Sequence, residues 1–533
     1  MGRNVARLVT LRIHKSPHSP KRLIRSNHVP TSGISTGVVA SYSHTRRLAF
    51  WLFATFQFFY LLTSTGRVRT PDEYNTLYTT ESLVLRGSTA VPQAVRLHNF
   101  YGRYDRTGQP RAAYPTGQAL VCAPWYALGQ YLLAHLPGVP GEDTDLIVAF
   151  ASCLSSATFS ALAVTFFFLL LGGIGIPVRA ALLAATILGL GTPIFAYSGW
   201  LFSEPLSAAI FMGVALMLFR HVQEPISSRT AFVAGLILGL ATLVRPTDVL
   251  AIPVFAAAVL VREGRPAWRA AFILCAASSI GVALLLAHNA LLFGGPFEFG
   301  YPTAAEGAKR LNSFETPLWI GLYGFLLSPG KSVFIFAPPV IVALAGLRRL
   351  WKIDHGVATV AIALPSLYLF FFASYTQWEG GYCVGPRYLV PSIALLCLGL
   401  GPMLAEGDSN IKKLAIFALA LGAFVQCVSL ATSFMEDQVP RGRYYDANWT
   451  YRLNYSLSGQ IHLLWKYLTS AEPARLGLGW DRWFVFLHKG GISAATLAVL
   501  GLCMIAGLSI STAGLVREIQ LLRPKTQDLR PKT

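Results

Sequence analysis

Charged residues are scarce in this chain. Only 13% of its 533 residues are Asp, Glu, Lys or Arg, whereas hydrophobic residues make up 53% and the mean hydropathy is +0.50. Soluble domains carry about 25% charged residues, so this composition excludes a series of soluble domains. Ten-residue segments of alternating polarity are also missing, which excludes a transmembrane barrel. The remaining long apolar runs must form helices, because lipid offers no hydrogen-bond partner to bare backbone groups.

Cysteine pairs with the spacing of a metal or redox site are missing too. The seven cysteines show no C-x-x-C spacing and lie mostly within apolar runs, so we assign them neither a disulfide nor a metal role. We find no convincing internal repeat and no separate cleavable signal. Together these observations predict an all-α polytopic membrane protein.

The apolar runs predict about twelve transmembrane helices, several of them shorter than the roughly 20 residues of a full crossing. The boundary between the fifth and sixth spans is placed at Arg245-Pro246, because proline disfavours helix in the residue before it. The predicted spans are 48–66, 144–171, 178–197, 201–221, 230–245, 247–262, 270–292, 331–347, 356–374, 387–404, 413–434 and 491–512.

Acidic residues are nearly absent from one side of this predicted topology. With both termini cytoplasmic, the inner segments hold 25 Lys and Arg against 7 acids, and the outer segments hold 19 against 18. This asymmetry agrees with the positive-inside rule. The net charge of +19 and the pI near 9.8 therefore indicate topology and contact with anionic lipid, not nucleic-acid binding. We expect a multi-pass protein of a bacterial plasma (inner) membrane.

The sequence divides into a membrane domain, 48–434, with flanking segments. We predict a disordered basic cytoplasmic tail at 1–47, a basic cytoplasmic tail at 513–533, a last span at 491–512, and a small outer-face segment at 435–490. The first outer loop, 67–143, is long enough to be structured. Within it, 72–86 has helix start signals at Pro71 and Asp72 and a stop at Gly87. The stretch TGQALVCAPWYALGQYLLAHL predicts a helix that lies in the membrane interface.

Three acidic residues are candidates for chemistry. Asp72 and Glu73 follow the first span in TGRVRTPDEYNTL, and Glu204 begins the fourth span in GWLFSEPLSAAI. Asp72 read alone fits a helix cap, and Glu204 read alone fits a charge at the interface. The topology nevertheless brings acids from two distant parts of the chain to the same membrane face, which favours a site.

Basic and aromatic residues reach the same face. Arg245, Lys331 and Arg387 end or begin spans there and are read either as interfacial anchors or as ligands of an anion, since guanidinium holds phosphate with a fork of donors. Tyr301 and Trp378 fit either an interface belt or a platform for stacking a sugar.

These motifs resemble the GT-C superfamily of integral-membrane glycosyltransferases. The acidic pair after span 1, the Y-P-x-G-type turn before the interfacial helix and the S-E-P at the head of span 4 carry the resemblance. The branch in question is the bacterial one related to dolichyl-phosphate-mannose protein mannosyltransferases and to the aminoarabinose transferases of lipid A. The later strings HNALLFGGPFEFGY, GLYGFLLSPGKSVFIFAPPV and WEGGYCVGPRYLVP are similar to a pattern of bacterial members.

The resemblance implies transfer of a sugar from a polyprenyl-phosphate donor to an acceptor hydroxyl on the outer face, by a hexosyl- or pentosyltransferase. It implies that Asp72 is the base or orients the acceptor, with Glu73 as a substitute, and that Glu204 is a second acid near the acceptor or a metal. It also implies that Arg245 neutralises the leaving phosphate. A divalent metal is compatible with these oxygens, but the sequence has no metal site of fixed spacing.

The chain departs from the family in one place. Many relatives have Lys-Pro-Pro at the start of the interfacial helix, where this chain has Ala113-Tyr114-Pro115. The phosphate contact of that lysine then falls to Arg111, Lys331 or Arg387. Tyr114, Tyr301, Trp378 and Glu379 are expected to line the substrate site.

Three other functions are considered. A transporter or flippase of a lipid-linked or anionic substrate would place polar groups near the midplane, often in repeated halves, whereas the charges here gather at one face. A structural lipid-binding protein would need no clustered acids. A different polymerase or ligase using polyprenyl-linked sugars would be expected to keep its key residues in the late outer segment, for example at Arg443 or Asp446.

The charge asymmetry predicts the result of reporter fusions. Fusions after residues 90, 265 and 460 are expected to report outside, inside and outside, because the basic loops remain in the cytoplasm. Paired alkaline phosphatase and fluorescent reporters measure the two sides. An inside signal at residue 90 would contradict the topology.

Overall fold

The computed structural model describes residues 42–98, 100–135, 144–221, 224–302, 313–381, 383–432, 457–469, 482–489 and 491–522. Outside these ranges lie most of the predicted tail 1–47, the end of the tail 513–533, and most of the outer segment 435–490. Arg443 and Asp446 belong to that undescribed part.

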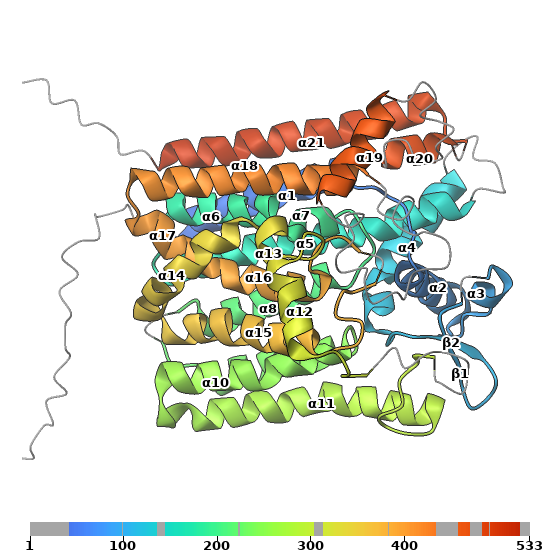
Figure 1. Ribbon diagram of the computed structural model, residues 1–533, viewed down its shortest axis with the longest axis horizontal. Coiled ribbons are helices and arrows are strands. Elements are labelled where there is room, and N and C mark those ends of the chain that lie inside the picture. The colour runs from blue at the N-terminus through green and yellow to red at the C-terminus, as the bar shows by residue number, and fades with distance from the viewer. Residues whose placement is uncertain are drawn as a thin grey trace, which may run out of the picture. The chain divides into compact units, whose positions relative to one another are not determined.

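Helices occupy the positions of all twelve predicted spans, and they run side by side along the length of the described domain (Figure 1). The helices at the predicted spans are α1 (Tyr42–Thr63), α5 (Thr144–Gly173), α6 (Val178–Gly191), α7 (Pro193–Tyr197), α8 (Glu204–Phe219), α9 (Ser228–Ala241), η1 (Pro246–Leu250), α10 (Ala251–Glu263), α11 (Trp268–Phe293), α13 (Val333–Phe336), α14 (Pro339–Ile353), α15 (His355–Ala373), η4 (Arg387–Leu389), α16 (Val390–Leu396), η5 (Cys397–Gly399), α17 (Leu400–Glu406), α18 (Ser409–Ala431) and α21 (Ala494–Leu521).

Within the described residues, six of these helical segments are long and apolar enough to cross a membrane, and shorter apolar helices accompany them. Proline explains two departures from the predicted bounds. Pro193 divides the third span into α6 and α7, and Pro338-Pro339 delay the main helix of the eighth span to residue 339, since proline is favoured only in a first helical turn. Among the residues that the structure describes, the fold is all-α apart from one short hairpin, as the composition predicts.

Apart from the helices of the first outer loop, four short helices of the described residues lie outside the predicted spans. One of them, α12, is a ten-residue apolar helix that the sequence analysis did not single out. They are η2 (Arg265–Ala267), α12 (Leu318–Leu327), α19 (Leu457–Thr469) and α20 (Trp483–Lys489).

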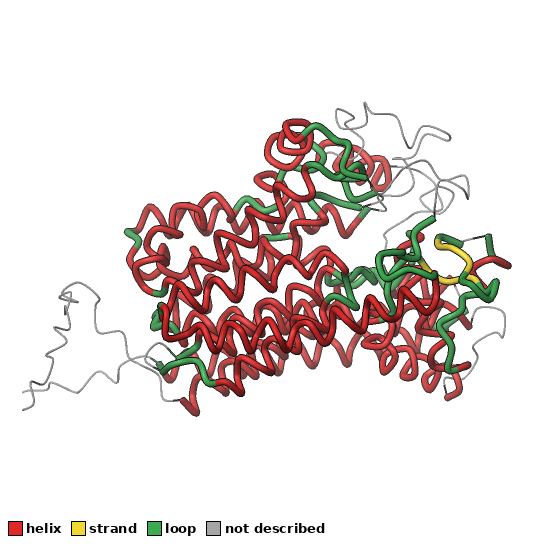
Figure 2. The backbone as a smooth tube through the Cα atoms, turned by 90° about the horizontal axis from the view of Figure 1, so that it is seen from below, coloured by secondary structure: helices red, strands yellow, loops and turns green. Residues whose placement is uncertain are grey.

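The first outer loop is structured and gathers at one end of the long helices (Figures 1 and 2). It contains α2 (Pro71–Arg86), α3 (Pro92–Arg96), the strands β1 (Gly102–Tyr104) and β2 (Pro110–Ala112), and α4 (Gly117–His135). The predicted helix at 72–86 is confirmed, and Gly87 ends it with φ +60°. The two antiparallel strands, with Arg103 opposite Arg111, were not predicted from the polar turn region.

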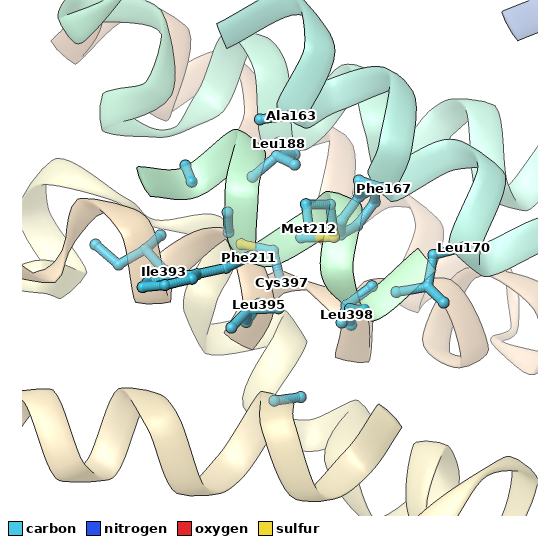
Figure 3. Close-up of a cluster of buried hydrophobic side chains, with 14 of the residues drawn as sticks. Ala163, Phe167, Leu170, Leu188, Phe211, Met212, Ile393, Leu395, Cys397 and Leu398 are labelled. Carbon is cyan, nitrogen blue, oxygen red and sulfur yellow. The ribbon is translucent and has the colours of Figure 1, made fainter. Parts of the chain in front are cut away.

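Two kinds of packing hold the long helices. A buried cluster joins side chains of α5, α6, α8 and α16 to the turn after α16 (Figure 3). Helices α9 and α11 are in backbone contact. A Cβ on Gly239 would lie only 2.3 Å from the carbonyl oxygen of Ser278, so this position has room for glycine alone. Small residues allow such backbone contact between membrane helices. This contact fixes α9, whose C-terminal end leads into the candidate site.

The N-terminus of α2 is fixed by a capping box that Glu73 completes. Thr70 Oγ1 accepts from the Glu73 backbone N–H at 3.3 Å, and Glu73 Oε2 accepts from the Thr70 N–H at 3.1 Å. The same oxygen accepts from the Arg69 N–H at 3.1 Å, while Oε1 accepts from the Leu201 N–H at 3.1 Å. Glu73 is fully buried. It therefore ties the start of α2 to the segment that precedes α8.

We expect Glu73→Ala to lower the free energy of unfolding by about 3 kcal/mol, because several buried backbone donors lose their acceptor. Thermal unfolding in detergent measures this loss. Glu81→Gln, an acid of the same helix whose side chain is 23% exposed and paired, among the described residues, only with Arg86 at 3.2 Å, is the matched control and should unfold like the wild type. A Glu73→Ala protein as stable as that control would contradict the structural role.

Candidate functional site

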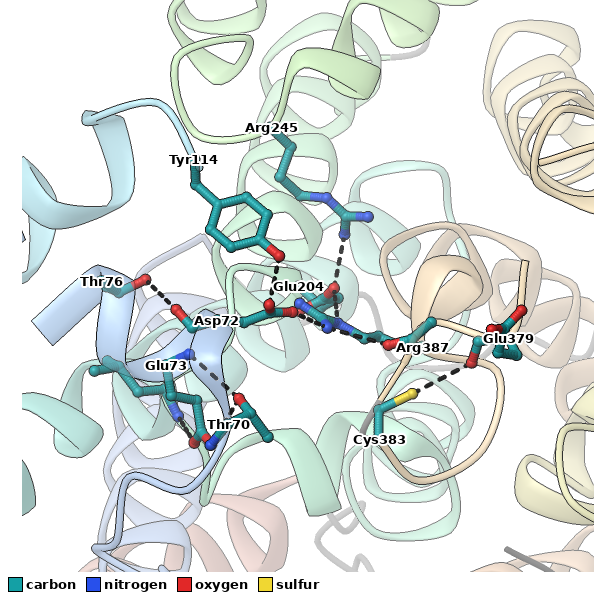
Figure 4. Close-up of polar contacts among 12 residues, drawn as sticks. Thr70, Asp72, Glu73, Thr76, Tyr114, Glu204, Arg245, Glu379, Cys383 and Arg387 are labelled. Carbon is teal, nitrogen blue, oxygen red and sulfur yellow. Dashed lines mark hydrogen bonds and ion pairs between the residues drawn. The ribbon is translucent and has the colours of Figure 1, made fainter. Parts of the chain in front are cut away.

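Four charged side chains from distant parts of the chain meet at the end of the bundle that carries α2 (Figure 4). Asp72 lies in the first turn of α2, and Glu204 is the first residue of α8. Carboxylates at these positions interact favourably with the helix dipole. Arg245 lies in extended backbone just after α9, as expected before a proline, and Arg387 begins η4.

The guanidinium of Arg387 joins the two acids. Its Nε donates to Glu204 Oε1 at 2.8 Å, and its Nη1 forms an ion pair with Asp72 Oδ2. Its plane also lies against the ring of Phe202, with the guanidinium carbon 4.2 Å from the ring centroid. Tyr114 donates its hydroxyl to the other oxygen of Asp72 at 2.5 Å. Asp72 is thus held from both sides, by one cation and one neutral donor.

Arg245 is less firmly paired. Its Nη1 lies 3.3 Å from Glu204 Oε1 and makes no hydrogen bond among the described residues, and Glu204 Oε2 likewise lacks a hydrogen-bond partner there. The Glu204 side chain is 1% exposed and that of Arg245 is 9% exposed. Two carboxylates and two guanidiniums give a formally neutral group, but its hydrogen-bonding capacity is not used up. A polar ligand would find an uncommitted donor at Arg245.

These residues line a cavity of about 280 Å³, close to the lower end of the size range of small-molecule sites. Its polar side is formed by the charged cluster, and its other walls are largely aromatic. The lining residues outside the charged cluster include Thr76, Tyr101, Tyr114, Gln118, Phe202, Phe299, Tyr301, Phe314, Phe371, Phe372, Tyr375, Gln377 and Tyr388. Tyr301 meets Tyr114 edge to face, with ring centroids 5.6 Å apart. Such a cavity suits a ligand that has an anionic group and a larger, partly apolar body.

The structure brings together six residues that the sequence singled out as site candidates. Asp72, Glu204, Arg245 and Arg387 form the charged cluster, and Tyr114 and Tyr301 lie on the adjoining wall. The topology predicted that positions 72 and 204 lie close together beside basic side chains. Their joining through the single guanidinium of Arg387 was not predicted.

The other candidates do not line this cavity. Glu73 is fully buried in its capping box, and Trp378 is 4% exposed and packs edge to face on Phe325. Lys331 is 1% exposed and donates to the carbonyl of Cys383. Glu379 lies in the loop before Arg387 but outside the lining. We therefore make no use of these four as ligand-contacting residues.

Arg111 also lies outside the cavity, in the hairpin. Its Nε donates to Asp105 at 2.7 Å and its Nη1 to Thr89 at 2.6 Å. Partial burial works against ionisation of Asp105, but hydrogen bonds from Thr107, Gln109 and Arg111 prevail and lower the pKa of Asp105 to about 2. Because Asp105 stays ionised, Arg111 is committed to holding the hairpin.

Asp248 is a buried charged group near the site that the sequence analysis missed. It is 0% exposed and accepts hydrogen bonds from Ser207 at 2.6 Å and from Tyr368 at 2.9 Å. In the motif Arg245-Pro-Thr-Asp248 only the arginine and the helix boundary were singled out, although an acid between two apolar runs signals a buried polar contact. The aromatic side chains Phe371, Tyr375 and Tyr388 were also missed, because nothing in sequence separates cavity-lining rings from lipid-facing ones.

Metal binding was left open by the sequence. Over the described ranges, no three His, Cys, Asp or Glu residues come together as a metal-binding group. The oxygens of Asp72 and Glu204 instead face guanidinium groups.

Burial raises the pKa of Glu379 to about 7, although a backbone hydrogen bond and the charge of Lys331 work against the shift. Since the folded protein holds the proton more tightly than the unfolded chain, the stability contributed here is full below the unfolded pKa and falls as pH rises towards 7. We expect Glu379→Gln to be more stable than the wild type at pH 8, by about 1–3 kcal/mol, and equal to it near pH 4.5. Thermal unfolding in detergent at both pH values tests this, with Glu81→Gln on α2 as control. An equal effect at both pH values would contradict it.

Comparisons with known proteins give similar structures but no sequence match. No protein-family model and no curated protein matches the chain. The ArnT structure from Cupriavidus metallidurans in the apo state is 13% identical, with a TM-score of 0.48, over 88% of this chain and 73% of that one. Its complex with undecaprenyl phosphate is 15% identical, with a TM-score of 0.45, over 91% and 78%. The oligosaccharyltransferase of Archaeoglobus fulgidus in the apo form is 13% identical, with a TM-score of 0.42, over 78% and 60%. At these values the activity of the chain has to be inferred from its own residues.

Proposed function

We propose that this chain is a membrane glycosyltransferase that moves a sugar from a polyprenyl-phosphate donor to an acceptor hydroxyl on the outer face of a bacterial inner membrane. The observation that carries the proposal is the joining of Asp72 and Glu204 by Arg387 within an aromatic-walled cavity. The motifs that resemble GT-C enzymes supply the reaction class.

Asp72 is assigned as the base. Its side chain is 20% exposed, the most accessible of the four charged groups, whereas Glu204 is 1% exposed. In the proposed displacement, the acceptor oxygen attacks the anomeric carbon, its proton passes to Asp72, and the bond from that carbon to the phosphate oxygen breaks. A positioned base contributes about 10²–10⁴-fold to such a rate. Tyr114 fixes the carboxylate through its other oxygen.

Arg245 and Arg387 are assigned to the leaving phosphate, which gains negative charge as the bond breaks. Both guanidiniums line the cavity, and Arg245 keeps an unused donor. A donor aimed at developing charge in a dry site is worth about 10²–10³-fold in rate. An incoming phosphate competes with Asp72 for Arg387, so donor binding would release the base for the acceptor. Glu204, which remains beside both arginines, holds them in place.

A transporter or flippase is the alternative. The charged group lies at the ends of α2, α8 and α9 and the start of η4, not at mid-helix breaks in repeated halves, where transporters place their sites. This position favours the transferase.

Asp72→Asn is expected to lower transfer by about 10²–10⁴-fold, because the amide cannot take the proton, while the protein stays folded in the membrane. The measurement uses purified protein in nanodiscs and the polyprenyl-phosphate sugar that accumulates in cells deleted for the gene, identified by mass spectrometry. Glu81→Gln, an acid of the same helix paired with Arg86 at 3.2 Å, is the control and should keep full activity. Near-normal turnover of Asp72→Asn would remove the mechanism.

A further inference from the structure

Lys331 is a fully buried cation close to the site but outside its cavity. It is 1% exposed and is among the largest fully buried side chains of the described residues. Taking an ammonium group out of water costs several kcal/mol even after relaxation. Since the Lys331 ammonium does not line the ligand cavity, its burial must be explained by a contact within the protein.

The contacts of Lys331 supply that reason. Its Nζ donates to the carbonyl oxygen of Cys383 at 2.9 Å and lies 3.2 Å from the Cys383 sulfur. Its own backbone is fixed, since the Lys331 N–H donates to Ser328 Oγ at 3.1 Å and Ser332 caps the next helix. The Lys331 side chain thus links the turn at residues 328–332 to the loop that precedes Arg387.

That loop has a conformation that needs outside support. Gly380 and Gly385 have φ values of +82° and +63°, a region that side chains rarely adopt. Gly385 also lies so close to Phe336 that a Cβ would be 2.8 Å from its ring. Cys383 lies between these two glycines, so the Lys331 contact sets the orientation of a peptide group at the centre of the loop.

The loop in turn sets Arg387. The Arg387 N–H donates to the Gly385 carbonyl at 3.0 Å, and its Nη1 also donates to the Gly380 carbonyl at 3.3 Å. A second support comes from Tyr197, whose hydroxyl donates to the Val384 carbonyl at 2.9 Å. One end of the loop, at Gly380, therefore contacts the Arg387 guanidinium, and the other end, at Gly385, holds the Arg387 backbone. Lys331 and Tyr197 hold the residues between these two glycines.

We propose that Lys331 is a positioning residue for Arg387, acting through the Cys383 peptide group, and that it does not contact the donor phosphate. For catalysis this inference rests on the proposed function. Misplacement of a catalytic group by about 1 Å can cost 10²-fold in rate, which gives the loop a reason to be fixed by a charged hydrogen bond, one of the stronger kinds.

A double-mutant cycle tests the coupling. Lys331→Met is expected to lower kcat/KM for the polyprenyl-phosphate sugar by about 10–10²-fold. In an Arg387→Lys background the guanidinium that donates to both acids is already lost. There, Lys331→Met should lower kcat/KM by no more than about twofold. Lys352→Met, an exposed lysine of α14, is the control and should match the wild type. Fully additive losses would overturn the proposal, since a merely structural lysine would act equally in both backgrounds.

A second readout does not depend on turnover. Cys383 is 0% exposed, so a soluble maleimide should label it slowly in wild-type protein and at least tenfold faster in Lys331→Met, with mass spectrometry of the Cys383 peptide as the measurement. An unchanged rate of Cys383 labelling in Lys331→Met would overturn the claim that Lys331 holds the loop. If Lys331→Met does not accumulate, Lys331→Gln is used in both experiments. Wild-type protein that transfers no sugar would defeat the proposed function alone, and labelling would still decide whether Lys331 holds the loop.

Discussion

The bridge that Arg387 makes between two carboxylates is the interaction on which the site depends. Asp72 and Glu204 lie at the N-termini of different helices, where each gains from the helix dipole but where two acids facing one cavity would repel each other. One planar guanidinium can donate to both acids at once, in fixed directions, which an ammonium group cannot do. The bridge therefore joins the structured outer loop to the membrane helices through the same groups that are assigned to the chemistry.

This arrangement also accounts for the many buried hydrogen bonds that surround the site. The capping box of Glu73 fixes the helix turn that carries Asp72. The Glu73 carboxylate also accepts a hydrogen bond from the backbone N–H of Leu201, three residues before Glu204. The loop glycines, Tyr197 and Lys331 fix Arg387 from the opposite side. Such a site tolerates little displacement of the arginine, because the N–H donors of one planar guanidinium lose their alignment with both acceptors at the same time. Several buried charges that resemble ligands in sequence are thus supports for the few that reach the cavity.

The membrane helices could be predicted because an apolar run of sufficient length has few alternatives in lipid. The meeting of Asp72 with Glu204 followed from topology, since chain direction fixes which helix ends share a face. Topology could not tell which basic residues reach the ligand. Lys331 and Arg387 both begin predicted spans, but only contacts in three dimensions show that the Lys331 side chain points into packed protein. The hairpin at 102–112 was missed because three-residue strands with polar side chains leave no hydrophobic period, and Asp248 because its hydroxyl partners Ser207 and Tyr368 are distant in sequence.

Tyr114 illustrates how charge balance constrains the site. The four charged residues that line the cavity, Asp72, Glu204, Arg245 and Arg387, are formally neutral as a group. A lysine at position 114 would add a positive charge next to Arg387. Tyr114 instead donates a neutral hydrogen bond to Asp72 at 2.5 Å and adds a ring to the aromatic wall beside Tyr301. If the chain transfers sugar as proposed, Arg245 and Arg387 hold the phosphate on one side of the cavity, and Tyr114 holds the base from the other side.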